Sequence, residues 1–89
     1  MEILVIDDHP VVSRGISQIL DQEHDMRVAA QAGTIDEALL LLRQRSFDVL
    51  VLDVNLPGRN GLEALPEIHR IAPAMPILIF SIHSEEHLA

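Results

Sequence analysis

Three aspartates stand at the ends of two strongly apolar runs of this chain. Asp7 and Asp8 follow residues 2–6, and Asp53 follows residues 48–52. In an open parallel α/β sheet the carboxyl ends of the strands share one edge, so we expect these three carboxylates to lie close together. Carboxylates at such short distances repel one another unless a hard divalent cation lies among them, and oxygen ligands suit Mg²⁺. The spacing therefore predicts a magnesium site at that edge.

The elements that must position these aspartates alternate between short β-rich runs and longer helical periods. Such alternation is typical of βαβ units and a parallel sheet. We expect strands at residues 2–6, 26–32, 48–52 and 76–81, with helices between them. The run at 48–52 is apolar throughout, which predicts a central strand buried on both faces. The run at 26–32 is less apolar, as suits an edge.

The first two helices have clear start signals. Pro10 suits a first helical position, where its missing N–H costs nothing. Apolar residues then recur at helical spacing and predict one buried face: Val12, Ile16, Ile19 and Leu20. Thr34 and Glu37 form a capping box that opens the second helix, which is expected to end near Arg45.

Residues 55–61 carry a dense turn signal, and a third helix is expected from Leu62 to Ala72. Leu62, Leu65 and Ile68 are predicted to face inward. Pro66 falls in the early part of this helix, where an interior proline can introduce a kink.

Composition limits the classes of function. The 89 residues form one domain, and a hydrophobic content of 48% is ample for a core. A net charge of −8 argues against direct binding of nucleic acid or of an anionic membrane. The chain has no cysteine, no signal-peptide start and no apolar run long enough to span a bilayer, so we expect a cytoplasmic protein. The five histidines lack metal-ligand spacing and are expected at the surface.

Together these residues resemble the receiver domain of two-component response regulators, over the whole chain. Asp7 and Asp8 look like the family's acidic pair, and Asp53 like its phospho-accepting aspartate. The run from Asp53 to Gly61, DVNLPGRNG, is similar to the family's Asp-x-x-x-Pro-Gly-x-x-Gly motif, and Ser81 stands where the family keeps Ser or Thr. Asp-His-Pro after the first strand resembles the branch that carries a helix-turn-helix DNA-binding domain. The resemblance implies a flavodoxin-like, doubly wound parallel sheet of order 2-1-3-4 within residues 1–89.

The resemblance also implies roles for individual residues. Asp53 would take a phosphoryl group from a sensor histidine kinase, a phosphotransfer protein or a small acyl phosphate. Asp7, Asp8 and Asp53, with the backbone carbonyl of Asn55, would hold Mg²⁺. Ser81 would couple phosphorylation to movement of the end of the fourth strand, whereas Asn55 and His83 would tune hydrolysis. The protein would be a signalling switch and not a turnover enzyme.

The chain departs from the family pattern in one respect. All six basic residues are arginines, so the family's lysine has no counterpart in these 89 residues. The chain ends about one turn into an expected fourth helix that begins near Ser84, before the family's fifth strand and last helix. The fourth strand would then be an open edge, which predicts self-association or pairing with a missing segment.

Two other functions remain open at this stage. A degenerate receiver would act only through protein–protein contacts, without phosphorylation. A metal-dependent phosphatase or phosphotransferase would also use an aspartyl nucleophile, but such enzymes usually have Asp-x-Asp, whereas Asp53 is followed by Val54 and Asn55. Mg²⁺ binding and phosphorylation of Asp53 separate the first two hypotheses, and turnover of a phosphomonoester tests the third.

Overall fold

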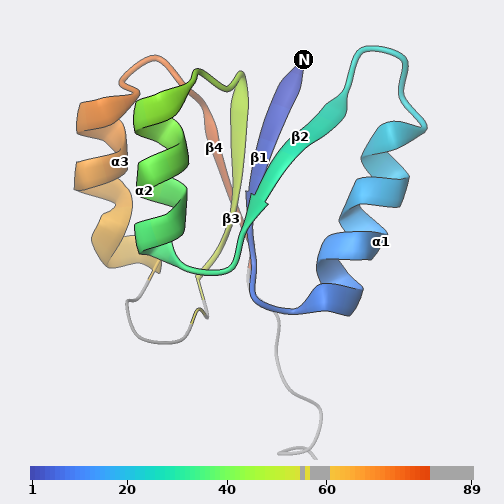
Figure 1. The fold of residues 1–89 in the computed structure, drawn as a ribbon, viewed down its shortest axis with the longest axis horizontal. Coiled ribbons are helices and arrows are strands. Elements are labelled where there is room, and N and C mark those ends of the chain that lie inside the picture. Colours follow the sequence, from blue (N-terminus) through green and yellow to red (C-terminus); the bar gives the residue numbers. More distant parts are fainter. Residues whose placement is uncertain (55, 57–60, 81–89) are drawn as a thin grey trace, which may run out of the picture.

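The chain folds around a parallel sheet of four strands, described here from a computed structural model that covers residues 1–54, 56 and 61–80. The strands are β1 (Glu2–Ile6), β2 (Arg27–Ala32), β3 (Val49–Asp53) and β4 (Ile77–Phe80). Their spatial order is β2-β1-β3-β4, as the family resemblance implied (Figure 1). This order is that of a flavodoxin-like, doubly wound sheet, in which the chain reverses direction across the sheet beside β1.

Helices cover both faces of the sheet. One face packs against α2 (Ile35–Gln44) and α3 (Leu65–Ile71), and the other lies beside α1 (Pro10–Asp21) (Figure 1). Successive side chains of a strand point to opposite faces. Leu4 and Ile6 of β1 therefore join the core under α2 and α3, whereas Ile3 and Val5 join the smaller core on the α1 side.

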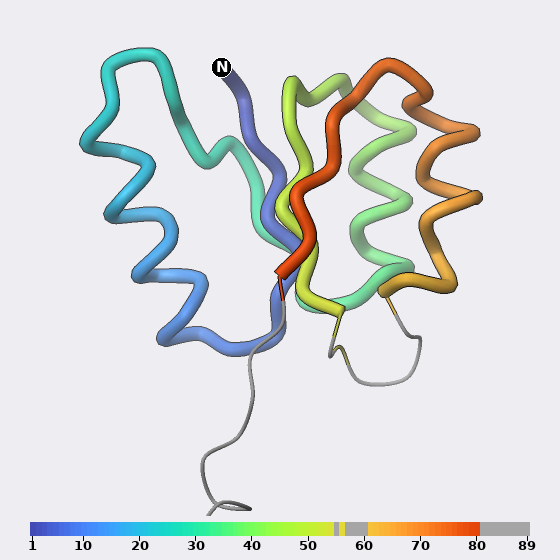
Figure 2. Tube along the Cα trace, turned by 180° about the vertical axis from the view of Figure 1, so that it is seen from behind, coloured from blue at the N-terminus to red at the C-terminus, as the bar shows by residue number. Residues whose placement is uncertain are grey.

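The strand β3 is central, as its unbroken apolar run predicted. It pairs with β1 on one side and with β4 on the other, and Leu50 and Leu52 are fully buried. The strand β2 lies at one edge, and β4 lies at the other edge of the sheet as described (Figure 2). Because β1 and β3 are adjacent and parallel, the residues that follow them meet at one edge of the sheet.

One expected core position of α1 is wrong. Val12, Ile16 and Leu20 face β3 and β4 and line an apolar groove, but Ile19 is 65% exposed. Positions i, i+4 and i+8 already form the contact stripe, so i+7 lies on its flank. Ser13, next to Val12, is the buried polar residue of this helix.

Thr34 is the N-cap of α2, as predicted, but the Glu37 carboxylate bonds to a different backbone N–H from the one that a capping box predicts. The hydroxyl of Thr34 accepts a hydrogen bond from the Glu37 N–H at 3.1 Å. The Glu37 carboxylate does not turn back to Thr34 itself but accepts from the Gly33 N–H at 2.7 Å. The acid thus ties the helix to the end of β2, one residue further back.

The third helix begins later than predicted. A short 3₁₀ turn, η1 (Gly61–Ala64), precedes α3, so Pro66 falls in the first turn of the α-helix and introduces no interior kink. Leu62, predicted to face inward, is 49% exposed because it belongs to this 3₁₀ turn. Leu65 is half-buried and Ile68 fully buried, as predicted.

None of the helices in the described part of the chain has the length and apolar character needed to cross a bilayer.

Candidate functional site

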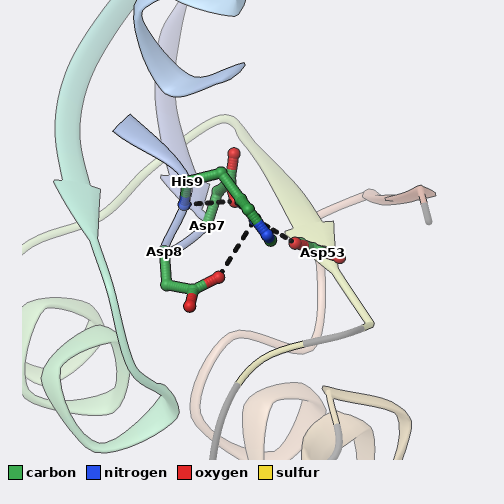
Figure 3. A group of neighbouring side chains, drawn as sticks. All are labelled: Asp7, Asp8, His9 and Asp53. Atoms are coloured by element: carbon green, nitrogen blue, oxygen red, sulfur yellow. Dashed lines mark hydrogen bonds and ion pairs between the residues drawn. The ribbon is translucent and has the colours of Figure 1, made fainter. Parts of the chain in front are cut away.

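The three aspartates meet at the carboxyl edge of the central strands, as their positions predicted. Asp7 follows β1, and its N–H donates to the Ala32 carbonyl at 2.9 Å, which continues the pairing with β2. Asp53 is the last residue of β3. One ligand atom from each of Asp7, Asp8, His9 and Asp53 lies within 4.8 Å of all the others (Figure 3).

The carboxylates differ in exposure. The side chains of Asp7 and Asp53 are fully buried, whereas that of Asp8 is 33% exposed. Burial removes charged oxygens from water, and this penalises the charged form unless a cation or hydrogen-bond donors replace the water. The edge of the sheet therefore holds the carboxylates of Asp7 and Asp53 away from solvent, and the carboxylate of Asp8 lies beside them in partial contact with solvent.

Asp7 is held in one orientation by donors from α1. One carboxylate oxygen, Oδ1, accepts a hydrogen bond from the His9 backbone N–H at 2.9 Å. The other, Oδ2, accepts from the buried Ser13 hydroxyl at 3.3 Å. Sequence reasoning missed Ser13, although a serine within the apolar stripe of a helix is a signal that a buried polar partner exists.

His9 is the second residue that sequence reasoning missed. Its side chain is 44% exposed, so it lies at the surface as expected, but its Nδ1 faces the carboxylates (Figure 3). Nδ1 lies 2.9 Å from an Asp7 oxygen, 3.1 Å from an Asp8 oxygen and 3.4 Å from an Asp53 oxygen. The signal was its position directly after the acidic pair, in the N-cap of α1.

The pKa of His9 is raised above its ordinary value of 6.5. The hydrogen bond with Asp7 is the largest cause, and the negative charges of Asp8, Asp7 and Asp53 add to it. Partial burial acts in the opposite direction and is outweighed.

Gly61, the first residue of η1, lies directly against the backbone of Asp53 and Val54. A Cβ at position 61 would lie 2.9 Å from the Asp53 carbonyl oxygen and 3.2 Å from the Val54 Cα. Both neighbours are backbone atoms, so a larger residue would displace the segment that carries the carboxylate. Close packing against the backbone therefore favours glycine at position 61, the last residue of the DVNLPGRNG run, in addition to its turn propensity. On the other side, the Val54 N–H donates to the Phe80 carbonyl at 3.1 Å and joins the ends of β3 and β4.

Three predicted site residues lie outside the described residues: Asn55, Ser81 and His83. The same holds for residues 57–60 of the predicted turn. Their roles remain predictions.

The donor set of the described residues fits a divalent cation. Three carboxylates converge from two strand ends, and the basic side chain that reaches them is an imidazole. Mg²⁺ is commonly held by one or two protein carboxylates and keeps several waters, so this set is sufficient for it.

Comparisons with known proteins agree with this arrangement. A family model described as "Response regulator receiver domain" matches residues 3–89. The nitrate/nitrite response regulator protein NarL of Escherichia coli K12 is 33% identical over 84 residues, which cover 94% of this chain and 39% of NarL. The chain spans about two fifths of the length of the curated relatives that it matches.

Solved structures give the same result. A two-component response regulator of the LuxR family from Aurantimonas sp. SI85-9A1 is 36% identical, with a TM-score of 0.85 over 93% of this chain and 59% of that one. A response regulator from Burkholderia pseudomallei, solved with a phosphorylated aspartic acid, a calcium ion and citrate, is 26% identical. Its TM-score is 0.82 over 99% of this chain and 51% of that one.

Proposed function

Since the chain belongs to the family of response regulator receiver domains, we propose that it accepts a phosphoryl group on the Asp53 carboxylate in a reaction that requires Mg²⁺. The observation that carries this proposal is the buried Asp53 carboxylate, which faces Asp7 and Asp8 across the ends of two adjacent strands. The response regulator from Burkholderia pseudomallei, solved with a phosphorylated aspartic acid and a calcium ion, supports the proposal by similarity.

In the proposed reaction an oxygen of Asp53 attacks the phosphorus of a phosphohistidine or of a small acyl phosphate. A P–O bond to Asp53 forms, and the bond to the donor's nitrogen or oxygen breaks, with its electron pair leaving on the donor. Such transfer depends on in-line positioning and on neutralisation of charge on the phosphoryl oxygens. A bound Mg²⁺ would supply that neutralisation.

The other residues have positioning roles in this proposal. Asp8 and Asp53 would bind Mg²⁺ through their carboxylates, and the Asn55 carbonyl would be a third ligand, with Asp7 assisting. Ser13 and the His9 N–H support this by fixing the Asp7 carboxylate. Ser81 follows Phe80, whose carbonyl accepts from Val54, so movement at the Asp53 end of β3 can pass to the end of β4. Asn55 and His83 would tune hydrolysis of the phosphoaspartate.

We further propose that residues 1–89 are part of the receiver domain of a cytoplasmic transcription regulator. The named relatives are response regulators of which this chain covers the receiver part, and one is of the LuxR family. The phosphoryl donor would be a sensor histidine kinase or a phosphotransfer protein. A net charge of −8 does not favour DNA binding by this segment itself.

Self-association through β4 is part of the same proposal. Leu78 is 62% exposed and Ile79 is 42% exposed on this edge strand, which also borders the apolar groove beside α1. An exposed apolar edge strand is a template for pairing with another chain. Light scattering at micromolar concentration tests this, and a monomer there would contradict it.

The degenerate receiver stays as the second candidate because the 89 residues contain no lysine. A charge-assisted hydrogen bond contributes about 1.5–3 kcal/mol, so transfer without the family's lysine would be slower. It would still proceed where the carboxylate site is intact. Since the relatives are response regulators, we do not propose the phosphatase reaction.

Intact mass spectrometry distinguishes the two candidates. The protein is incubated with Mg²⁺ and a small acyl phosphate, beside an Asp53→Asn variant and a sample with chelator. We expect one added phosphoryl group, absent from the variant and from the chelated sample. No addition to folded wild-type protein would favour a receiver that acts only through protein contacts.

A further inference from the structure

The imidazole of His9 occupies a position that the carboxylate site alone does not explain. The residue caps α1 without a side-chain cap hydrogen bond, and its Nδ1 points away from the helix and toward the three carboxylates (Figure 3). Pro10 begins the helix at the next residue, and the His9 N–H is bonded to Asp7, so the backbone at His9 is held from both sides. The ring position is therefore a consequence of the local fold.

The distances from Nδ1 resemble those within a coordination sphere. Around an octahedral ion with bonds of about 2.1 Å, neighbouring ligand atoms lie about 3.0 Å apart. Nδ1 lies 2.9, 3.1 and 3.4 Å from oxygens of Asp7, Asp8 and Asp53, respectively. An ion placed among the carboxylates would thus have Nδ1 at the spacing of a further ligand.

A nitrogen donor changes which ions a site prefers. Carboxylate and water oxygens suit Mg²⁺, Ca²⁺ and Mn²⁺, whereas imidazole suits Zn²⁺, Ni²⁺ and related ions. For a given set of N and O ligands, affinity also rises along the first transition row toward copper. Within the described residues, His9 is the histidine that belongs to a group of possible metal ligands, whereas His24 and His69 are exposed and lie outside that group.

We propose that His9 Nδ1 is a direct metal ligand, which makes this a mixed nitrogen–oxygen site that binds Co²⁺, Ni²⁺ or Zn²⁺ more tightly than Mg²⁺. The inference rests on the proposed cation site at Asp53 and goes beyond it, because it assigns a ligand and an ion preference. It does not depend on phosphorylation. The His9 imidazole would coordinate the transition-metal ions, whereas the aspartates would coordinate both these ions and Mg²⁺.

Calorimetric titration with MgCl₂ and CoCl₂ tests the ion preference. The wild-type chain is compared with His9→Ala and with a matched control, His24→Ala, which removes an exposed imidazole that does not belong to the group of Asp7, Asp8 and Asp53. We expect wild type to bind Co²⁺ at least about tenfold more tightly than Mg²⁺, and His9→Ala to lose about tenfold or more of the Co²⁺ affinity. Mg²⁺ affinity in that variant should fall by much less than Co²⁺ affinity, because oxygen ligands suit Mg²⁺. The control should change neither value.

Two results would overturn the assignment. Unchanged Co²⁺ affinity in His9→Ala would show that the imidazole is not a ligand. Tighter binding of both ions in that variant would show that His9 is a hydrogen-bond donor that competes with cations.

A second measurement needs no variant and reports ligation directly. In a ¹⁵N spectrum of the wild-type chain, recorded at a pH at which the His9 imidazole is already neutral, Zn²⁺ should shift the Nδ1 resonance of His9 much further than Mg²⁺ does. A Zn²⁺ titration that shifts other histidines but not His9 would contradict the proposal.

Failure of this inference and failure of the proposed function give different results. Phosphorylation of wild type with Mg²⁺, together with unchanged Co²⁺ affinity in His9→Ala, would reject the His9 ligand alone. Co²⁺ binding that depends on His9, without phosphorylation of Asp53, would keep the metal site and reject the phospho-acceptor function.

Discussion

Negative charge is arranged differently at the two ends of the central strands, β1 and β3. At the amino end, the Glu2 carboxylate lies 3.0 Å from the Arg45 guanidinium and 3.7 Å from that of Arg27. The Asp48 carboxylate accepts a hydrogen bond from the Glu2 N–H at 2.6 Å. These groups are solvent-exposed to a large extent, and each acid has a cation or an amide beside it.

At the carboxyl end, the side chains of Asp7 and Asp53 are buried, and that of Asp8 is 33% exposed. Within the described residues, no arginine forms an ion pair with Asp7 or Asp8, and the basic side chain beside them is the imidazole of His9. The same two strands thus begin with compensated surface charges and end in concentrated negative charge. Since concentrating buried carboxylates is unfavourable for folding, the difference supports the proposed cation site at the carboxyl end.

The largest effect should come from removing one negative charge at the carboxyl end. Asp8→Asn removes a proposed metal ligand and should weaken Mg²⁺ binding by about 10- to 100-fold, the equivalent of one charge-assisted contact. Asp48→Asn makes the same chemical change at the amino end and should leave binding unchanged. Calorimetry with MgCl₂ measures both. Equal losses in the two variants would show that only overall charge matters and would remove the contrast between the ends.

The close approach of Gly61 to Asp53 predicts the next effect. Gly61→Ala should lower the free energy of unfolding by about 1–3 kcal/mol and slow phosphorylation, because the new Cβ meets the Asp53 carbonyl at 2.9 Å. Gly15→Ala is the control, since nothing lies within 4 Å of a Cβ there and Gly15 is within α1. It should stabilise the protein by about 0.5–1 kcal/mol. Urea denaturation measures both, and a neutral Gly61→Ala would contradict the packing argument.

Ser13 tests whether orientation of Asp7 matters at the carboxyl end. Ser13→Ala removes the donor to Asp7 Oδ2 and should weaken Mg²⁺ binding by about tenfold. Ser17→Ala is the matched control on the same helix, because the Ser17 hydroxyl accepts from Gln31 and does not contact the acids. Mg²⁺ titration followed by NMR gives both constants. If the two variants bind alike, Ser13 has only a packing role.

The charge at the carboxyl end also predicts a pH effect in metal-free protein. Asp7→Asn should lower the pKa of His9, since the hydrogen bond to Asp7 is the largest cause of its elevation. Because the folded-state pKa is raised, protonated His9 stabilises the fold fully below its unfolded value of about 6.5. That contribution is lost as the pH rises through the folded value. NMR titration of His9 in chelator checks the shift, and an unchanged pKa in the variant would contradict it.

The smallest effect is expected at the amino end. Glu2→Gln removes the charge that Arg45 and Arg27 share and should cost at most about 1 kcal/mol, because exposed ion pairs are screened by water and salt. Thermal unfolding at low and high ionic strength measures this cost. A decrease of several kcal/mol in the free energy of unfolding that persists in high salt would contradict this prediction. It would show that charge at the amino end is as important for stability as charge at the carboxyl end.

Much of the fold followed from local patterns in the sequence. The strand β1 has the bounds that were predicted, and Thr34 is the cap of α2, because alternation, apolar runs and cap residues act over a few positions. Errors occurred where contact with other elements decides: Ile19 and Leu62 are apolar at helical spacing, yet they lie beside the buried stripe or in a 3₁₀ turn. Periodicity places residues on a face but does not say how wide the contact with the sheet will be.

The candidate site divides along the same line. The sequence by itself determined that Asp7, Asp8 and Asp53 follow strands, and hence that parallel pairing would bring them to one edge. Only the tertiary structure decided that Ser13 and His9 would join them, and that Gly61 would press against the Asp53 backbone. Strand ends are defined by local propensity, whereas the contacts of a helix cap or a turn depend on how α1 and η1 pack against the sheet, which no short segment of sequence specifies.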